Sequence, residues 1–300
     1  MTPYASPIRY VRWSATHRTL DAAEVHSTFA ALRDRVLLFA FETDRMVVEP
    51  HSGELSVKVV ARGAERYVIG GRMVTLEPGR ILLTNAGQQY ASSIDQRGTR
   101  SLSLFLPPHE VVWAQDALRR REAALLDAPG MHGGIPEVAQ APFRPQRPLR
   151  QAAERLIVTA FDVRRPELDE LQDLARLLAF EALAEAMRIV PPGALASCVR
   201  RSTRDELIAR VLRARDFVED RAGHASLQEM AEVACLSKYH FLRAFTEVVG
   251  RTPARYAAGI RLNRGRAMLE AGAPGQTAAR RAGYQSASAL RRALRRNRSV

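Results

Sequence analysis

The sequence predicts an α+β protein that joins a strand-rich amino-terminal part to an all-helical carboxyl-terminal domain. Alternation of apolar and polar residues over 24–106 predicts short β-strands. Over 107–125 and 149–190 the apolar spacing changes to that of helices. Residues 200–300 hold 21 basic and 9 acidic side chains, a balance of +12, whereas the first 199 residues hold 24 and 23. The chain therefore divides into parts of different secondary structure and different charge.

The strands are predicted by runs such as Leu55-Ser56-Val57-Lys58-Val59 and Arg66-Tyr67-Val68-Ile69, which alternate and are separated by turn signals. Short strands at this spacing are typical of a sandwich or a small barrel. Gly70-Gly71, between two alternating runs, predicts a two-residue hairpin turn.

The helical stretch predicts a segment that connects the two parts. Pro and Gly are frequent over 128–148, which predicts a loop, and Pro191-Pro192-Gly193 ends the helices. The sequence thus predicts an amino-terminal domain over 1–135, a loop and helical linker over 136–199, and a third region over 200–300. An apolar stripe in the linker is predicted to bury against its own barrel or a second copy of the chain, and consists of Leu168, Leu171, Leu174, Leu177 and Leu178.

Composition excludes several classes of protein. Hydrophobic residues make up 46% and charged residues 26%, so the chain is not disordered as a whole. Two cysteines, Cys198 and Cys235, are too few for a disulfide framework or a four-thiolate zinc site. No secretory signal and no apolar run of about 18 residues is found, which predicts a cytoplasmic protein without a membrane partner.

The basic third carries a pattern typical of a helix-turn-helix. Ser226 and Glu229 form a predicted capping box at the start of a short helix. Cys235-Leu236-Ser237 then predicts a tight turn, in which we expect Cys235 to be a buried space-filling residue and Ser237 to cap the next helix. That helix has one apolar face, while its opposite face is basic and polar. Excess positive charge and a basic helix of this kind predict binding to nucleic acid.

The residues from Ser237 to Phe245, followed by Gly250, Thr252-Pro253, Tyr256 and Arg261-Leu262, resemble the signature of the AraC/XylS family of transcription regulators. A second, partial copy runs from Ala279 to Leu294 and is similar to the second helix-turn-helix of the family. The resemblance covers about the last hundred residues. It implies two helix-turn-helix modules held apart by one long helix over 253–270, with their second helices in successive major grooves of double-stranded DNA.

The resemblance also implies which side chains face DNA. They are Lys238, Tyr239, Leu242 and Arg243 in the first module, and Ser288, Arg291 and Arg292 in the second. Only six residues follow Leu294, and the Gly, Pro and aromatic residues that support the first module have no counterparts there. Leu290 and Leu294 stand where the family usually has phenylalanine. We therefore expect the short second module to bind phosphates more than bases.

The strand-rich part is similar to the cupin-type sensing barrel of many family members, which implies a small-molecule effector, with Tyr67, Tyr90 and Trp113 as candidate lining residues. No pair of histidines shares a strand, so we expect no metal, no cofactor and no catalysis. The family also implies a homodimer and contact with RNA polymerase. Two alternatives remain: a metal-dependent cupin enzyme with a DNA-binding tail, and an architectural DNA-binding protein without sequence preference.

Overall fold

The structure of the protein is a computed structural model. Its chain divides into two compact units. The first unit is Met1–Pro192 with Arg200–Asp205, and the second is Gly193–Val199 with Glu206–Val300. Within these units the described residues are 8–30, 35–126, 137–162, 164, 166–190, 195 and 201–296. No helix in these ranges is long and apolar enough to cross a membrane.

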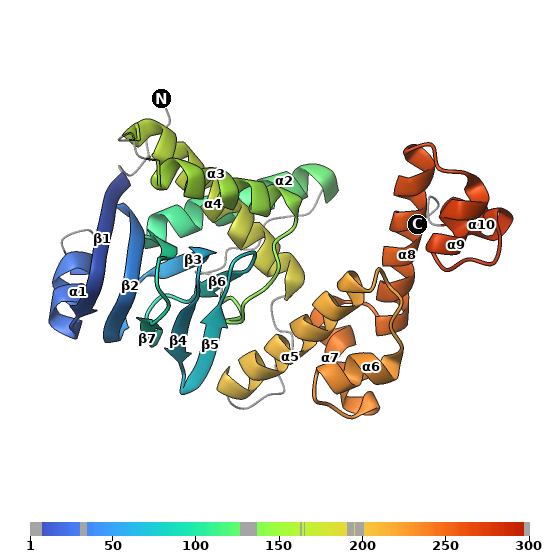
Figure 1. Ribbon diagram of the computed structural model, residues 1–300, viewed down its shortest axis with the longest axis horizontal. Helices are drawn as coiled ribbons and strands as arrows, with labels where there is room; N and C mark the ends of the chain where they lie inside the picture. Colours follow the sequence, from blue (N-terminus) through green and yellow to red (C-terminus); the bar gives the residue numbers. More distant parts are fainter. Residues whose placement is uncertain are drawn as a thin grey trace. The chain divides into compact units, whose positions relative to one another are not determined.

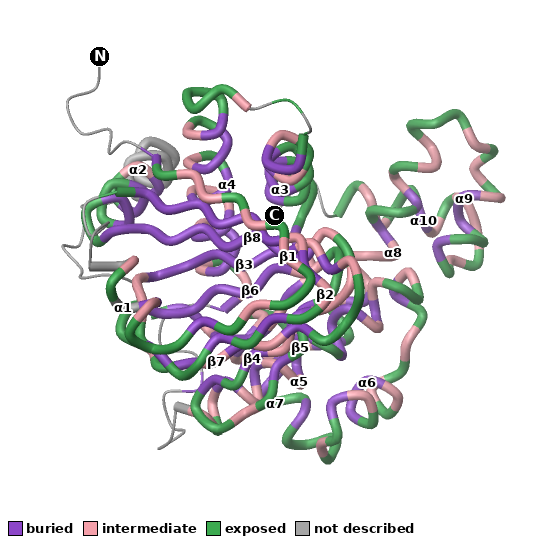
Figure 2. The backbone as a smooth tube through the Cα atoms, turned by 60° about the vertical axis from the view of Figure 1, so that its left-hand side comes forward, coloured by how far each residue is buried: buried purple, intermediate pink, exposed green. Residues whose placement is uncertain are grey.

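The described part of the first unit contains a single sheet that curls into a nearly closed β-barrel (Figure 1). Its strands are β1 (Ile8–Leu20), β2 (Val36–Ser52), β3 (Leu55–Arg62), β4 (Glu65–Ile69), β5 (Arg72–Leu76), β6 (Ile81–Thr84), β7 (Gln89–Ile94) and β8 (Thr99–Leu106). They follow the order β5-β4-β7-β2-β8-β3-β6, and β1 pairs with β2 in addition. Buried residues concentrate along these strands (Figure 2), so the core of the unit lies in the barrel.

Strand β2 pairs with three other strands. It pairs in parallel with β1 along most of its length, from Ile8 opposite Val36 to Leu20 opposite Val48. Its first half pairs antiparallel with β8 and its second half antiparallel with β7. One 17-residue strand thus connects both halves of the barrel wall.

The hairpin predicted at Gly70-Gly71 is confirmed, since these two residues connect β4 to β5. Their φ angles of 56° and 77° are in the left-handed region, which glycine adopts without a steric penalty.

The predicted strand region is wrong at its amino-terminal end. Strand β1 lies before residue 24, and Ala22–Ala30 forms a helix, α1, rather than a strand. The Asp21 carboxylate accepts a hydrogen bond of 2.7 Å from the Glu24 backbone N–H, which caps this helix. Alternation does not identify β1 because only its two end residues are buried and its partner strand begins 28 residues later.

Three further helices of the first unit gather beside the barrel (Figure 1). They are α2 (Pro108–Leu126), α3 (Arg147–Ala160) and α4 (Leu168–Ile189), in agreement with the predicted helical regions. The leucines of the predicted apolar stripe in α4 are not all buried. Leu171, Leu174 and Leu178 are buried within the unit, whereas Leu168 and Leu177 are exposed.

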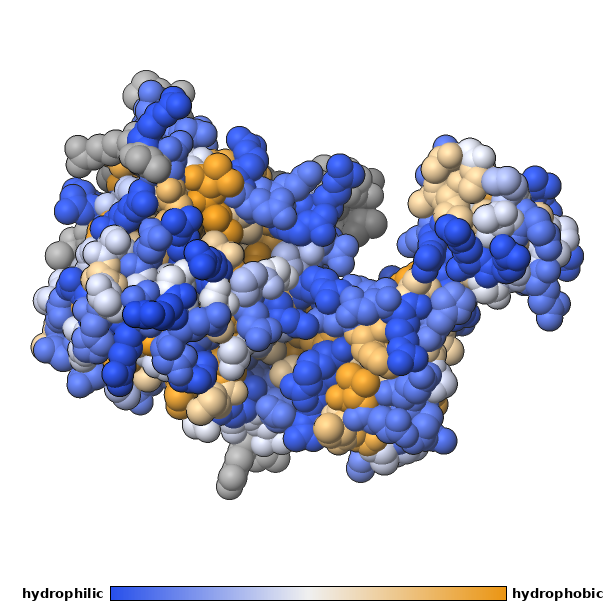
Figure 3. All heavy atoms as spheres, in the orientation of Figure 1, coloured by the Kyte–Doolittle hydropathy of each residue, from blue (hydrophilic) through white to orange (hydrophobic). Residues whose placement is uncertain are grey.

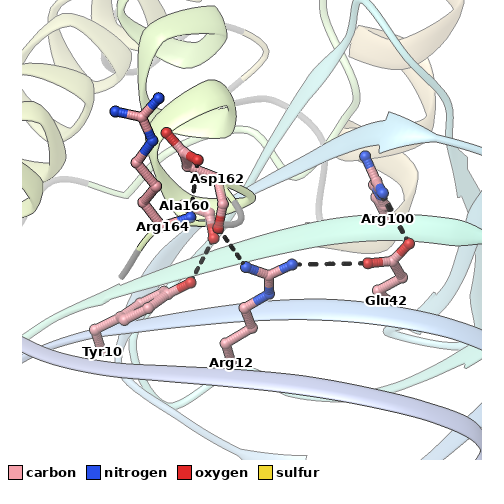
Figure 4. Close-up of polar contacts among 7 residues, drawn as sticks. All are labelled: Tyr10, Arg12, Glu42, Arg100, Ala160, Asp162 and Arg164. Carbon is pink, nitrogen blue, oxygen red and sulfur yellow. Dashed lines mark hydrogen bonds and ion pairs between the residues drawn. The ribbon is translucent and has the colours of Figure 1, made fainter. Parts of the chain in front are cut away.

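Polar contacts connect β1 and β2 to the end of α3 (Figure 4). The Tyr10 hydroxyl donates a hydrogen bond to the Ala160 carbonyl, and Arg12 Nη1 donates to the Asp162 carbonyl at 2.7 Å. Arg12 also lies 3.9 Å from the carboxylate of Glu42, which Arg100 binds from β8 at 2.9 Å. Burial raises the pKa of Tyr10 and keeps its hydroxyl protonated as a donor.

Among its described residues the second unit contains helices joined by short turns, and no strand. Helix α5 (Arg201–Asp220) leads into it, followed by α6 (Leu227–Val233), α7 (Lys238–Val249), α8 (Pro253–Glu270), α9 (Gly275–Arg281) and α10 (Ala287–Arg296). The long helix predicted over 253–270 is confirmed as α8. It begins with Thr252 as its cap and Pro253 in its first turn, where the missing proline N–H costs no hydrogen bond.

Gly265 allows α8 to approach α10 closely. A Cβ atom added at Gly265 would lie 2.8 Å from Leu290 Cδ1 and 3.1 Å from Ala282 Cβ. Leu290 is fully buried in a small cluster with Leu262, Ala278 and Ala279, so it has little room to move. A side chain at position 265 would therefore push α10 away from α8.

We predict that Gly265→Val destabilises the second unit by about 1–3 kcal/mol through overpacking. Gly259→Val is the matched control, because no atom lies within 4 Å of the added Cβ and the change in helix propensity is the same. Denaturant unfolding of both variants measures the difference. Equal losses of stability in the two variants would show that the close contact between position 265 and Leu290 does not determine the loss.

Candidate functional site

Helices α6 and α7 form the first helix-turn-helix of the second unit. The predicted capping box is present: Ser226 Oγ accepts from the Glu229 N–H at 3.2 Å, and the Glu229 carboxylate accepts from the Ser226 N–H at 2.8 Å. This hydrogen bond from the Ser226 backbone is the main cause that lowers the pKa of Glu229 below its usual value. Ser237 caps α7 by accepting from the His240 N–H, as predicted.

The prediction that Cys235 is buried is wrong, because its side chain is exposed. Its φ of 52° places it in the left-handed region, at the turn between the two helices. The chain reverses direction there, with the Leu236 N–H donating to the Ala231 carbonyl at 2.9 Å. A backbone hydrogen bond thus holds this turn, and the thiol lies in solvent.

One face of α7 is core, as predicted. Phe241, Phe245 and Val248 are fully buried, and the ring centroids of Phe241 and Phe245 lie 5.3 Å apart. Phe245 also contacts Tyr256 of α8 edge-on at 5.6 Å, and the Tyr256 hydroxyl donates to Glu219 of α5. This aromatic cluster fixes the orientation of α7 against α5 and α8.

The opposite face of α7 presents the predicted DNA-facing residues to solvent. Lys238, Tyr239 and Arg243 are exposed, and Tyr239 retains 73% of its accessible surface. Within the described part of the chain, Lys238 and Arg243 make no ion pair or side-chain hydrogen bond. Hydrophilic side chains dominate the visible face of this unit (Figure 3). Two cations and a phenol on one helix face are thus available to a partner.

Leu242 lies on this face but is not fully solvated, with an exposed fraction of 39%. Its side chain lines a shallow hollow between α6, α7 and α8, together with Leu227, Met230 and Pro253. More than half of this residue is therefore covered within its own module, and its outer part is available for an apolar contact.

Helices α9 and α10 form the second module, as predicted. Ser286 Oγ accepts from the Ala289 N–H at 3.2 Å and so caps α10. Ser288, Arg291 and Arg292 are exposed on α10, whereas Leu290 points into the core. This core is aliphatic, and its buried members are Leu262, Ala278, Ala279 and Leu290.

The barrel contains a cavity with a mostly apolar lining, to which β2 contributes the most residues. The lining consists of Trp13, Leu20, Glu24, Val25, Thr28, Phe39, Phe41, Met46, Val48, His51, Lys58, Glu65, Tyr90, Ser92, Ser103 and Phe105. Of the three aromatic candidates from the sequence, Tyr90 lines the cavity. Tyr67 is buried but absent from the lining, and Trp113 is exposed on α2.

Lys58 is the residue of the cavity that sequence reasoning missed. It is 2% exposed, and its Nζ donates to the Tyr90 hydroxyl at 3.0 Å and lies 4.0 Å from the ring centroid of Phe105. Burial lowers the pKa of Lys58 to about 7, against the opposing effect of Glu65. The signal in the sequence is a lone lysine between Val57 and Val59, in a strand whose residues Leu55 to Val60 are all buried.

The histidines do not assemble a metal site in the described residues, where no group of three potential ligands is found. The His51 ring packs on Tyr90 with centroids 4.5 Å apart, and its Nδ1 lies 2.8 Å from the Glu49 carbonyl. Burial lowers the pKa of His51 and favours the neutral ring. His17 and His109 are exposed, and His132 and Cys198 lie outside the described residues.

Comparison with known proteins identifies the second unit. Residues 230–299 match the family described as a helix-turn-helix domain. The chain is 36% identical over 74 residues to YbfI, an uncharacterised HTH-type transcriptional regulator of Bacillus subtilis. That match spans 24% of this chain and 27% of YbfI. The resemblance of the last hundred residues to the AraC/XylS family is confirmed.

Solved structures of AraC-like proteins are also similar to this chain. ToxT from Vibrio cholerae O395, bound to (E)-4-(8-methylnaphthalen-1-yl)but-3-enoic acid, is 8% identical, with 85% of this chain and 91% of ToxT covered and a TM-score of 0.32. The AraC-like transcriptional activator CuxR is 15% identical, with 73% of this chain and 68% of CuxR covered and a TM-score of 0.31.

Proposed function

Because this chain carries a helix-turn-helix domain of the AraC type, we propose that the protein is a transcription regulator. Its second unit binds specific sites on double-stranded DNA, and a small-molecule effector occupies the barrel of its first unit. The observation that carries the proposal is the outer face of α7, where exposed cations that have no partner among the described residues lie on a helix whose other face is buried. The protein acts by binding and not by catalysis.

The spacing of the two modules supports binding along one face of the duplex. Helix α8 has 18 residues, and a rise of about 1.5 Å per residue gives it a length of about 27 Å. Successive major grooves on one face are about 34 Å apart. A helix of this length, with the widths of the modules added, suits two adjacent grooves.

The residues of α7 are suited to reading bases. The Arg243 guanidinium donates two hydrogen bonds to O6 and N7 of a guanine, and the outer part of Leu242 contacts a thymine methyl group. Lys238 and Tyr239, in the first turn, bind phosphate or base edges beside them. The aromatic cluster on the buried face of α7 fixes the position of this helix, and therefore how far these side chains project towards DNA.

The second module contributes mainly contacts to phosphates. Its core contains fewer and smaller side chains than that of the first module, so α10 is held less firmly. Arg291 and Arg292 remain exposed, with Ser288 one turn before them. Charges on a less firmly held helix supply affinity that depends on salt and little on sequence.

We predict that Arg243→Ala weakens binding to the cognate site by about 1–3 kcal/mol and relaxes the preference at one base pair. Arg45→Ala removes the same charge from an exposed position of the barrel and serves as the control. Affinities for the cognate site, for single-base variants and for shuffled DNA measure the effect. An equal loss on all sites would identify Arg243 as a phosphate contact only.

For the second module, we predict that replacing both Arg291 and Arg292 by alanine weakens binding to every site alike. The slope of log affinity against log salt concentration should fall by about 2, since two phosphate contacts are lost. Binding measured over a series of salt concentrations gives this slope. Loss of preference for particular base pairs in one half-site would instead mean that α10 reads sequence.

A homodimer is part of the proposal, with α4 as the contact. Leu168 and Leu177 are the members of its leucine stripe that remain exposed. We predict a dimer at micromolar concentration for the full chain, and a monomer when both leucines are changed to serine. Sedimentation velocity distinguishes the two. A monomeric parent protein, or a double variant that remains dimeric, would contradict this arrangement.

A further inference from the structure

Two buried charges of opposite sign line the barrel cavity. Lys58 comes from β3 and Glu65 from β4, and each is only 2% exposed. The Lys58 Nζ donates one hydrogen bond, to the Tyr90 hydroxyl, and the Glu65 carboxylate accepts one from the Ser101 hydroxyl. Burial raises the pKa of Tyr67, and Glu65 lies close enough to the buried Tyr67 hydroxyl to raise it further. Each charged group therefore retains hydrogen-bonding capacity that neutral hydroxyls do not fill.

These two charges do not form an ion pair with each other. Among the described residues no carboxylate lies within 4.0 Å of Lys58 Nζ, and no cation lies within that distance of Glu65. They are still close enough for Glu65 to raise the pKa of Lys58 against the effect of burial. Separated charges in a low-dielectric interior are costly unless each gains a partner.

The other ionisable groups of the lining are already accounted for. Glu24 binds Arg18 at 2.5 Å, and burial disfavours the charged form of His51. The rest of the wall is largely apolar, and its hydrophobic members are Trp13, Leu20, Val25, Phe39, Phe41, Met46, Val48 and Phe105. A complementary ligand thus has an apolar body and a polar group that meets both Lys58 and Glu65.

We propose that the cavity binds a zwitterion with an apolar side chain, of which an apolar α-amino acid is the simplest form. Its carboxylate accepts from Lys58, its ammonium group donates to Glu65, and its side chain packs among Phe39, Phe41 and Met46. A ligand with a single charge would satisfy one of the two buried groups and leave an unbalanced charge in the cavity. This inference rests on the proposed function, because it names the class of effector that the barrel takes.

Calorimetric titration of the full-length protein without DNA tests the proposal. L-Phenylalanine is compared with 3-phenylpropionate, which lacks the ammonium group, and with 2-phenylethylamine, which lacks the carboxylate. The amino acid should bind at least tenfold more tightly than either analogue. Equal or tighter binding of either analogue, or no binding of the amino acid, would overturn the proposal.

Variants of Lys58 and Glu65 test which charged group of the ligand each residue binds. Lys58→Met should abolish the preference of the protein for phenylalanine over 2-phenylethylamine. Glu65→Gln should abolish its preference over 3-phenylpropionate, whereas Glu77→Gln, at an exposed position outside the cavity, should change neither ratio. Each ratio is measured within one variant, so a general loss of stability does not imitate the effect. Ratios unchanged by both cavity variants would place the ligand elsewhere.

DNA binding is measured separately, on the same unmodified protein. A protein that binds DNA but not the amino acid would leave the regulator proposal standing and reject the effector class. A protein that binds the amino acid but no DNA of any sequence would reject the regulator proposal and leave the ligand class of the cavity standing.

Discussion

Strand β2 is the element on which the first unit depends. It pairs with β1 on one edge and with β8 and then β7 on the other, so its two halves belong to both sides of the barrel wall. It also supplies Phe39, Phe41, Met46, Val48 and His51 to the cavity. The hydrogen-bond ladders of β2 therefore position five of the side chains that line the cavity. A change in the register of β2 by one residue would turn these side chains outward.

The helices of the two modules in the second unit are packed together by different kinds of side chain. In the first, aromatic rings in tilted and edge-on contact connect α7 to α8, and the Tyr256 hydroxyl adds a hydrogen bond to Glu219 of α5. In the second, Gly265 brings two helix axes close enough for alanine and leucine to fill the space. The buried side chains of the first module include two phenylalanines, whereas those of the second are alanines and leucines.

Local signals predicted much of this fold. The Gly70-Gly71 hairpin, the capping box of α6 and the bounds of α8 each depend on a few adjacent residues, and each is confirmed. The parallel pairing of β1 with β2 and the burial of Lys58 depend on residues far apart in sequence, so periodicity did not predict them. The exposure of Cys235 was missed for another reason, since cysteine is among the residues most often buried, whereas this one lies exposed in the turn between two helices.

The distribution of amines and thiols has a practical consequence. The chain has two lysines, Lys58 and Lys238, and the first is enclosed in the barrel while the second is exposed on α7. The exposed thiol of Cys235 lies three residues before Lys238, in the turn that precedes the same helix. Fluorophores, biotin or resins coupled to Lys238 or Cys235 would thus attach beside the basic outer face of α7. Immobilisation for interaction measurements is better directed to an end of the chain or to a cysteine introduced on the barrel.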